Sequence, residues 1–479
     1  MVLLIGSHPA GNDLIRQYEG IGVAVIWHKE VSSGGFILNE YDELCLIPED
    51  NEVYRAVVLM AELAATYDVN AHNGRKIVCH LLTQFADTLK LLQTTDLCDA
   101  LRRKIDIYPF TMAEIWSRSI VLDYEPITIH SDKHVHLVIF GMGDVAETVA
   151  IQAAHIAHYP NYVRNHSLRT RITMINENAE TLSEGIIKRY KHLFDNSYYR
   201  VVKPSEERAV KFFHKPMYDG KREDFVDVEW EFVDAESWNP DVREKLKQWA
   251  KDDKQLLTVV MADRDEDKNV AMSLFLPDEL YQWSIPIHKY SPNAVEYDVS
   301  MPLVQMAKNV NYIYSQCNND NFENWQGQIH TSVEINRADR DKLWADLSNV
   351  KRWSSIYNAM TIPSKMRSIG LGEDDWEEFY DISQQDIEIL AQVEHNRWNV
   401  EELILGYRPC TDEEQDKIAA DVETQKDVFK TRKIHYDLRA YNDVRPDKTG
   451  KSAQMYDLCL SSALPLIAKT FVDEKGGEA

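Results

Sequence analysis

The sequence predicts an α/β protein in which two tandem domains, each built on a parallel sheet, precede a mostly α-helical domain. Three observations predict this class. Short apolar runs alternate with amphipathic stretches over the first 300 residues, which is typical of parallel sheets covered by helices. A glycine-rich turn follows one of these runs directly. After about residue 300 the chain looks mostly helical and irregular.

The first domain, residues 1–128, is expected to contain five strands. Several of the stretches between its apolar runs have helical period, for example Tyr54 to Ala65. The first turn, Gly6 to Asp13, is flanked by glycine but lacks the spacing of a dinucleotide-binding fingerprint. We interpret the domain as Rossmann-like. Its expected strands are Val2–Ile5, Gly22–Trp27, Leu44–Ile47, Lys76–Leu82 and Lys104–Tyr108.

The second domain, residues 129–300, is expected to repeat this organisation. His136–Phe140 is an apolar run of the fully buried type, and a helix from Ala150 to His158 follows it. Further strands are expected at Arg171–Ile175, Asp227–Val233, Leu256–Ala262 and Ser284–Tyr290.

A dinucleotide-type motif, Gly141-x-Gly143-x-x-Ala146, follows the first strand of the second domain. The first glycine permits the tight turn, the second lets the backbone approach a pyrophosphate, and the small third residue lets the helix pack against the strand. The free N–H groups at the start of that helix suit a phosphate. The motif lies between a buried strand and a helix, which is the context that it requires.

Two polar positions accompany the motif. Asn176, at the end of the second strand, holds the place where such domains have a ribose-binding acid, and Glu177 follows it. Asp144 follows the second glycine, and we expect it to cap the helix, although it also places a negative charge near the phosphate. A dinucleotide site and a vestigial turn both remain open readings.

The second domain resembles the TrkA-N (RCK-type) Rossmann domain. The resemblance rests on residues 138–143 and on residues 259–269, where Asp263 ends a strand before an asparagine-containing helix. It implies binding of NAD(H) or an adenine nucleotide around Asp263. Because such domains regulate potassium transporters or channels, it also implies an alternative role as a cytosolic regulator of an ion transporter in another chain.

The third part is read as a helical linker or platform, residues 301–382, followed by residues 383–472. Within the latter, Ala391, His395, Trp398 and Glu402 share one face of a helix, with Arg397 beside it. A ring that stacks, a guanidinium that forks and an imidazole that donates can together hold a nucleotide or phosphate. The alternative is that Trp398 is a core residue and His395 its neighbour.

The segment His395 to Trp398, with Gly406-Tyr407 and the later His435 to Leu438 and Asp457, resembles the RyR domain, the ryanodine-receptor repeat. Tyr407 and Tyr436 stand where that family usually has tryptophan and proline. The whole order resembles bacterial proteins that combine TrkA-N and RyR domains, including a segment at residues 354–370. The resemblance implies architecture, and it implies a ligand site for which the candidate residues are Lys365, Arg367, His395, Arg397, Trp398, Tyr407 and Tyr441.

Composition limits the function classes. A formal net charge of −25 disfavours binding to nucleic acid, because the chain has no excess of cations to replace counterions. No apolar stretch approaches the length of a membrane span, so a cytoplasmic protein is expected. The 6 cysteines include no Cys-x-x-Cys pair, which predicts reduced structural thiols and no metal.

Three functions are compatible with these observations. The favoured one is a regulatory protein that senses an adenine nucleotide, NAD(H) or an ADP-ribose-type ligand, in which Trp398, Tyr407 or Tyr441 stacks on a base and Lys365, Arg367 or Arg397 takes phosphates. An NAD(P)-dependent or nucleotide-processing enzyme is disfavoured because no catalytic set is recognisable. A scaffold with vestigial sites is the third. A homodimer is expected by resemblance, and an unidentified protein partner would receive the signal.

Overall fold

The computed structural model describes residues 1–32, 35–121, 125–204, 210–216, 224–292, 295, 297–299, 301–317, 334–378, 381–420, 428–446 and 452–476. Its contacts divide the chain into two compact units. The N-terminal unit contains Met1–Ser119, Ser291–Pro302 and Lys342–Trp353, and the C-terminal unit contains Ile120–Tyr290, Leu303–Asp341 and Ser354–Ala479. The sequence did not indicate that residues 291–302 and 342–353 complete the N-terminal unit.

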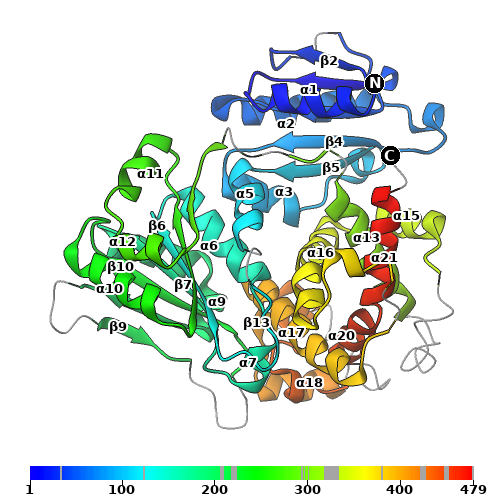
Figure 1. Ribbon diagram of the computed structural model, residues 1–479. Coiled ribbons are helices and arrows are strands. Elements are labelled where there is room, and N and C mark those ends of the chain that lie inside the picture. Colours follow the sequence, from blue (N-terminus) through cyan, green and yellow to red (C-terminus); the bar gives the residue numbers. More distant parts are fainter. Residues whose placement is uncertain are drawn as a thin grey trace. The chain divides into compact units, whose positions relative to one another are not determined.

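A five-stranded sheet, entirely parallel, forms the centre of the N-terminal unit, in the order β2-β1-β3-β4-β5 (Figure 1). All five strands match runs that the sequence predicted. They are β1 (Val2–Ile5), β2 (Val25–His28), β3 (Glu43–Leu46), β4 (Ile77–Leu82) and β5 (Ile105–Phe110). The helices that begin in this unit are α1 (Gly11–Gly20), α2 (Val53–Thr66), α3 (Ala86–Thr94), α4 (Asp99–Arg102) and α5 (Met112–Val121).

Alternation along these strands buries both faces of the sheet. Leu3 and Ile5 pack in one apolar cluster with residues of α2, whereas Val2 and Leu4 pack in another with Leu14 of α1. Successive residues of a strand point to opposite faces of the sheet. Because both sets of side chains on β1 are buried, helices cover the sheet on both faces.

The C-terminal unit contains a seven-stranded sheet in the order β12-β11-β6-β7-β10-β8-β9, in which only β9 is antiparallel to its neighbour. The α/β class with parallel sheets that the sequence predicted is therefore confirmed. The strands are β6 (His134–Phe140), β7 (Thr170–Asn176), β8 (Tyr198–Val202), β9 (Val210–His214), β10 (Val228–Asp234), β11 (Gln255–Met261) and β12 (Ile287–Lys289).

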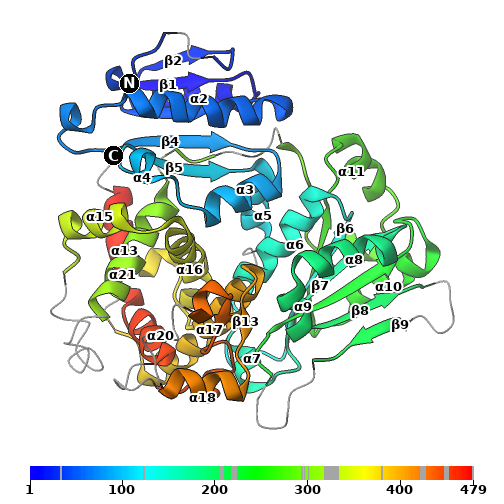
Figure 2. The same cartoon turned by 180° about the vertical axis from the view of Figure 1, so that it is seen from behind.

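Helices cover both faces of this sheet (Figure 2). Val242 and Leu246 of α10, together with Leu280 of α12, pack on one face, whereas Phe194 of α9 packs on Trp230 on the other. The sequence anticipated five of the seven strands but neither β8 nor β9. The helices are α6 (Asp144–Ile156), α7 (Asn161–Arg164), α8 (Ala179–Arg189), α9 (Lys191–Asn196), α10 (Pro240–Lys251), α11 (Glu266–Ser273) and α12 (Asp278–Gln282).

The described residues after β12 are mainly helical, as the sequence predicted. Among them, a two-stranded parallel ribbon joins β13 (Arg408–Pro409) to β14 (Ile434–His435). Helix α17 is the longest, and it contacts α20 and also α6, α7 and α9 of the sheet region. The helices are α13 (Pro302–Cys317), α15 (Arg337–Asp346), α16 (Asn349–Ser368), α17 (Gln384–Ile404), α18 (Asp412–Ala420), α20 (Ala453–Ser462) and α21 (Leu464–Gly476).

Two cysteines depart from the expectation of reduced thiols. Cys317, at the end of α13, forms a disulfide with Cys459 of α20 across 142 residues of sequence. Spacing along the sequence carries no signal for a pair so distant, because the helix packing alone brings the two side chains together. No described helix is long and apolar enough to cross a membrane.

Candidate functional site

The glycine turn after β6 brings the start of α6 close to two strand ends. Gly141 has φ of +121°, a left-handed value that favours glycine, and a Cβ there would lie 3.2 Å from the carbonyl oxygen of Ala262, just after β11. The same Cβ would lie 3.5 Å from the Cβ of Ala146, which is completely buried. Glycine at 141 and alanine at 146 thus permit the close approach of the helix that the motif predicts.

The first turn of α6 is open to a ligand. Gly143 is the N-cap residue, and no side chain accepts a hydrogen bond from the helix start. Among the described residues, none accepts a hydrogen bond from the backbone N–H groups of Asp144, Val145 and Ala146. A Cβ added at Gly143 would meet nothing within 4 Å. These three donors at the positive end of a 13-residue helix form a seat for an anion.

Asp144 does not cap α6, so that expectation was wrong. Its carboxylate instead accepts hydrogen bonds from Arg264, with the Nε of the guanidinium 2.7 Å away. The capping geometry fails because Asp144 is already the first helical residue, whereas a cap must precede the helix. The pair is partly exposed, with Arg264 at 40% and Asp144 at 38%, so the guanidinium stays accessible beside the anion seat.

The other predicted residues of this group lie at the same edge of the sheet. Asn176, the last residue of β7, accepts a hydrogen bond from the backbone of Asn178, and Glu177 is exposed. Asp263 accepts from the N–H of Asp265 at 2.9 Å, and its own N–H is held by the side chain of Asn269. Asp263 therefore shapes the loop after β11.

The strand order explains why these residues meet. From β6 the chain proceeds through β7 and β10 on one side of the sheet, and then returns to β11 and β12 on the other side. The carboxyl ends of β6 and β11 therefore flank the point where the strand order reverses. Open parallel sheets bind their ligands at this position. Gly141, Gly143, Asp144 and Arg264 all lie there.

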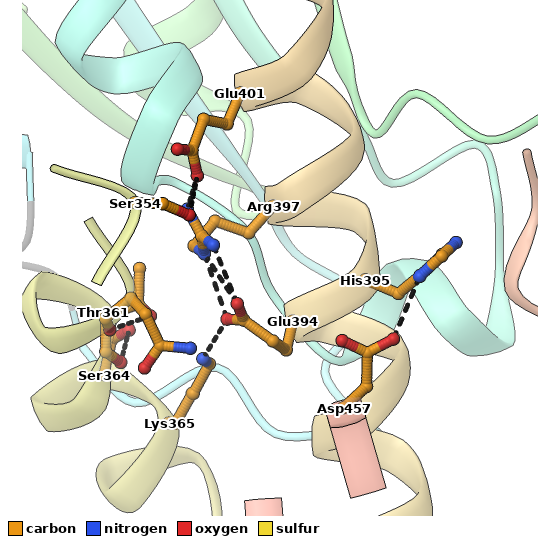
Figure 3. A network of polar contacts seen from close by, with 10 residues as sticks. Ser354, Thr361, Ser364, Lys365, Glu394, His395, Arg397, Glu401 and Asp457 are labelled. Carbon is orange, nitrogen blue, oxygen red and sulfur yellow. Dashed lines mark hydrogen bonds and ion pairs between the residues drawn. The ribbon is translucent and has the colours of Figure 1, made fainter. Parts of the chain in front are cut away.

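A second polar centre lies between α16 and α17 (Figure 3), and its four charged side chains are buried. Glu394 accepts from Lys365 at 2.7 Å and from Arg397 at 2.8 Å. Arg397 also donates to Glu401 at 2.5 Å, and Ser354 donates to the same carboxylate at 3.2 Å. The two cations and two carboxylates thus balance one another.

Burial alone raises the pKa of Glu394, but the adjacent guanidinium of Arg397 and ammonium of Lys365 outweigh burial and hold that pKa well below its usual range. The carboxylate is therefore ionised and both cations are committed to it. Lys365 and Arg397, which the sequence offered as phosphate ligands, have exposed fractions of 4% and 1%. We accordingly assign both to the network, and Arg367, which is half-buried, lies outside it.

His395 points away from this network, although it follows Glu394 directly. Its Nδ1 pairs with Asp457 of α20 at 2.9 Å, and its Nε2 lies 3.0 Å from the carbonyl oxygen of Arg439. Burial opposes the charged imidazole, but the Asp457 carboxylate outweighs it and raises the pKa of His395. Asn399 donates to the same Arg439 carbonyl. His395 thus links α17 to α20 through Asp457 and to the loop that contains Arg439.

The aromatic candidates form a row linked by ring contacts. Trp398 and Tyr407 both make edge contacts with His435, with ring centroids 4.8 and 6.3 Å apart, and Tyr441 contacts His395 at 5.6 Å. Trp398, Tyr407 and Tyr441 are all half-buried. The structure thus joins these three rings to His395, whereas Lys365 pairs with Glu394. The sequence did not single out His435 as the ring that joins them.

Comparison with known proteins found no matching family model, no similar curated protein and no similar solved structure. The resemblances to TrkA-N and RyR domains therefore remain expectations from the sequence. Arg264 and the role of Glu394 were missed as site features. The sequence signal for Arg264 was its place just after a strand end, at the edge where ligands bind. Within the described residues, no group of three or more histidine, cysteine or acidic side chains could hold a metal ion.

Proposed function

We propose that the chain is a nucleotide-binding regulatory protein whose ligand is an adenine nucleotide, NAD(H) or an ADP-ribose-type molecule. The observation that carries the proposal is the open first turn of α6 at the point where the strand order reverses. Three free N–H groups, a glycine that leaves space above them and a helix dipole are complementary to a phosphate or pyrophosphate. The protein is proposed to be cytoplasmic and homodimeric.

Arg264 is proposed to bind the same phosphate. Its guanidinium is exposed by 40% and pairs with Asp144, the first residue of α6. A guanidinium has five N–H donors, so it can hold the carboxylate of Asp144 and a phosphate oxygen together. Asp144 then positions Arg264, and the negative charge that it brings is compensated locally.

A signal is proposed to pass through α6 to the helical region. His155 of α6 stacks on Tyr357 of α16, with ring centroids 4.1 Å apart and an angle of 2° between the rings. Gln152 of α6 donates to the Sδ of Met360, one turn further along α16. Helix α17 also contacts α6. A ligand at the N-terminus of α6 therefore acts on a helix that is packed against both α16 and α17.

The residues 383–472 are proposed to supply a second contact surface, where Trp398, Tyr407 and Tyr441 are the rings available for stacking on a base. A regulatory role is favoured over catalysis because the strongly ionised groups of this region, Glu394 and Arg397, are buried against each other. A catalytic acid or base must reach its substrate within hydrogen-bond distance.

The test is a thermal-shift panel of NAD, NADH, ATP, ADP, AMP, ADP-ribose and cyclic nucleotides. A ligand at about 100 times its Kd is expected to stabilise the native state by about 2.7 kcal/mol, which gives a readily measured rise in Tm. Gly143→Asp is expected to abolish the rise, because its carboxylate fills the anion seat. Gly185→Asp is the matched control, since Gly185 on α8 also has nothing within 4 Å of an added Cβ.

The outcomes separate the competing functions. A shift that Gly143→Asp abolishes and Gly185→Asp keeps supports the phosphate seat. A shift that only Trp398→Ala abolishes moves the ligand to the helical region and contradicts the seat on α6. No shift with any compound overturns the nucleotide proposal. Turnover of a bound nucleotide contradicts a purely regulatory role.

A further inference from the structure

Glu402, near the C-terminal end of α17, carries a half-buried carboxyl group that no described residue contacts through a hydrogen bond or an ion pair. The two buried carboxylates of the same helix differ from it, because Glu394 and Glu401 both pair with Arg397. Polar groups that folding removes from water are ordinarily hydrogen-bonded. The carboxyl group of Glu402 is therefore left over from the packing of the helices and is available to a ligand.

The neighbouring cations do not neutralise Glu402. Arg397 is held by its two other carboxylates, and Lys433 donates to the carbonyl oxygen of Leu405 at 2.7 Å. Burial, and secondarily the charge of Glu401, raise the pKa of Glu402 to about 8, so the group holds its proton at pH 7. The charged and titratable groups that act on it or respond to it are Glu401 and Arg397 of α17, Tyr407, Lys430, Lys433 and Tyr314 of α13.

Two aromatic rings flank this carboxyl group. Trp398 lies one helical turn before Glu402 and on the same face of α17. Tyr407 follows the helix, and the charge of Glu402 adds to burial in raising the pKa of the Tyr407 hydroxyl. The planes of both rings stand steeply to that of His435, at 79° and 67°. Both rings are half-buried, so a planar ligand can stack on either of them.

Two exposed lysines lie beside the rings. The Nζ of Lys433 is 5.7 Å from the centre of the Tyr407 ring, and the charges of Lys430 and Lys433 both act on Glu402. Neither ammonium has an acidic partner within the part of the chain that the structure describes. Lys365, by contrast, is buried in an ion pair. The two exposed lysines are therefore the cations of this region that can bind a phosphate.

The protonated carboxyl group determines which base fits. It offers a hydroxyl donor and a carbonyl acceptor side by side. The pairing edge of adenine offers the complementary groups, a ring nitrogen that accepts and an amino group that donates. Guanine offers adjacent donors, which suit an ionised carboxylate instead. We propose that Glu402 recognises the base of a nucleotide that stacks on Trp398 or Tyr407, and that it selects adenine over guanine. Lys430 and Lys433 then bind the phosphates.

This assignment rests on the proposed binding of an adenine nucleotide, but it does not depend on the phosphate seat at α6. It adds a specificity-determining residue and two phosphate ligands to the helical region. It also makes recognition dependent on pH. The carboxyl group must hold its proton in order to donate to the base, so binding is expected to weaken as the pH rises through the raised pKa of Glu402.

Isothermal titration calorimetry with ADP and GDP at pH 7 and pH 9 tests the assignment. ADP is the part that ATP, NAD and ADP-ribose have in common, and GDP differs from it only in the base. At pH 7 the wild type is expected to bind ADP at least about tenfold more tightly than GDP, which is the value of one paired base edge. At pH 9 the affinity for ADP is expected to fall about tenfold, because Glu402 has lost its proton.

Two substitutions at one position separate recognition from a structural role. Glu402→Gln keeps a donor and an acceptor, so it is expected to retain the binding of ADP and to lose the fall at pH 9. Glu402→Leu removes both groups and is expected to lose the preference for ADP over GDP. Glu388→Gln, at an exposed position of the same helix, is the matched control and is expected to keep the wild-type pH profile. Circular dichroism checks that each variant is folded.

The results distinguish this assignment from the proposed function. Binding of ADP that neither Glu402→Leu nor pH 9 weakens overturns the role of Glu402, whereas the phosphate seat stands if Gly143→Asp abolishes that binding. Equal affinities of the wild type for ADP and GDP overturn the selection of adenine. A pH profile that Glu402→Gln leaves unchanged shows that another group titrates and overturns the assignment. Failure of every nucleotide to bind overturns the proposed function as well.

Discussion

At the scale of single residues, the largest effect on stability is the cost of leaving a buried charge without a partner. Glu394 is the only carboxylate that contacts both Lys365 and Arg397 in the described network, and all three are buried. Removing one partner of a buried ion pair leaves an uncompensated charge, which costs far more than the pair itself contributes.

Glu394→Gln is therefore expected to lower the free energy of unfolding by about 3–5 kcal/mol. Urea unfolding followed by circular dichroism measures the loss. Glu388→Gln removes a carboxylate from an exposed position on the same helix and is expected to change the stability by less than about 0.5 kcal/mol. Equal effects of the two substitutions would show that the Glu394 network contributes nothing to the free energy of unfolding.

Glu402 gives the C-terminal unit a dependence on pH. Burial, and secondarily the charge of Glu401, raise the pKa of Glu402 from its usual 4.5 to about 8. A group whose pKa is raised in the folded state favours folding fully below its ordinary pKa, and this contribution is lost as the pH rises through the raised value. The wild type is thus expected to lose stability between about pH 4.5 and pH 8.

Glu402→Gln removes this loss, because an amide does not ionise. At pH 8 the variant is expected to be more stable than the wild type by about 2–4 kcal/mol, whereas at pH 4.5 the two are expected to be nearly equal. Denaturant unfolding at the two pH values measures the difference. A gap that does not change with pH would contradict the raised pKa.

The sequence identified many of these residues but not their roles. Lys365 and Arg397 have the chemistry of phosphate ligands, yet the packing of α16 on α17 surrounds both with carboxylates. Glu394 and His395 have different partners, because adjacent residues on a helix point in different directions. The sequence did not reveal that Lys365, 29 residues before Glu394, completes the network, since that depends on how two helices cross.

At the scale of elements, the disulfide joins α13 to α20. Beside it, Tyr314 of α13 stacks on Tyr456, with ring centroids 4.7 Å apart. The next residue, Asp457, holds His395 of α17. The crosslink thus restrains the helix that carries a partner of the candidate site. It closes a loop of 142 residues, and a loop of this length strongly reduces the entropy of the unfolded chain.

Cys317→Ser is expected to lower the free energy of unfolding by about 2–5 kcal/mol. Thermal unfolding without reductant measures the loss. Adding a reductant under unfolding conditions is expected to bring the wild type to the level of the variant. Cys98→Ser is the control, because Cys98 is an exposed free thiol. A wild type that is indifferent to both the substitution and the reductant would show that the crosslink has no effect on stability.

Strands whose own residues form a continuous apolar run were predicted correctly from the sequence. Buried parallel strands such as β6 and β11 are nearly continuous apolar runs, so their sequence reveals them. Strand β8 contains Arg200, whose guanidinium pairs with Glu231 of the neighbouring strand β10. A charged residue interrupts the apolar run, and only pairing across the sheet explains it. Residues 291–302 likewise join the N-terminal unit through distant contacts, such as that of Tyr297 with His80.

At the scale of the whole molecule, each compact unit has its own parallel sheet and its own apolar core. The proposed phosphate seat belongs entirely to the C-terminal unit, because β6, α6 and Arg264 all lie within Ile120–Tyr290. A ligand stabilises the structure that must be intact in order to bind it. Its effect on local opening therefore reports which parts of the chain unfold together.

A bound nucleotide is expected to slow hydrogen exchange in β6, β11 and α6 while leaving β3 and β4 of the N-terminal unit nearly unchanged. At about 100 times the Kd, amides that exchange only when the C-terminal unit opens are expected to slow by about 100-fold. Mass spectrometry of peptides from both units measures this, and Gly143→Asp with the same nucleotide is the control. Equal slowing in both units would mean that they open as one cooperative structure, so that the ligand at α6 stabilises the whole chain.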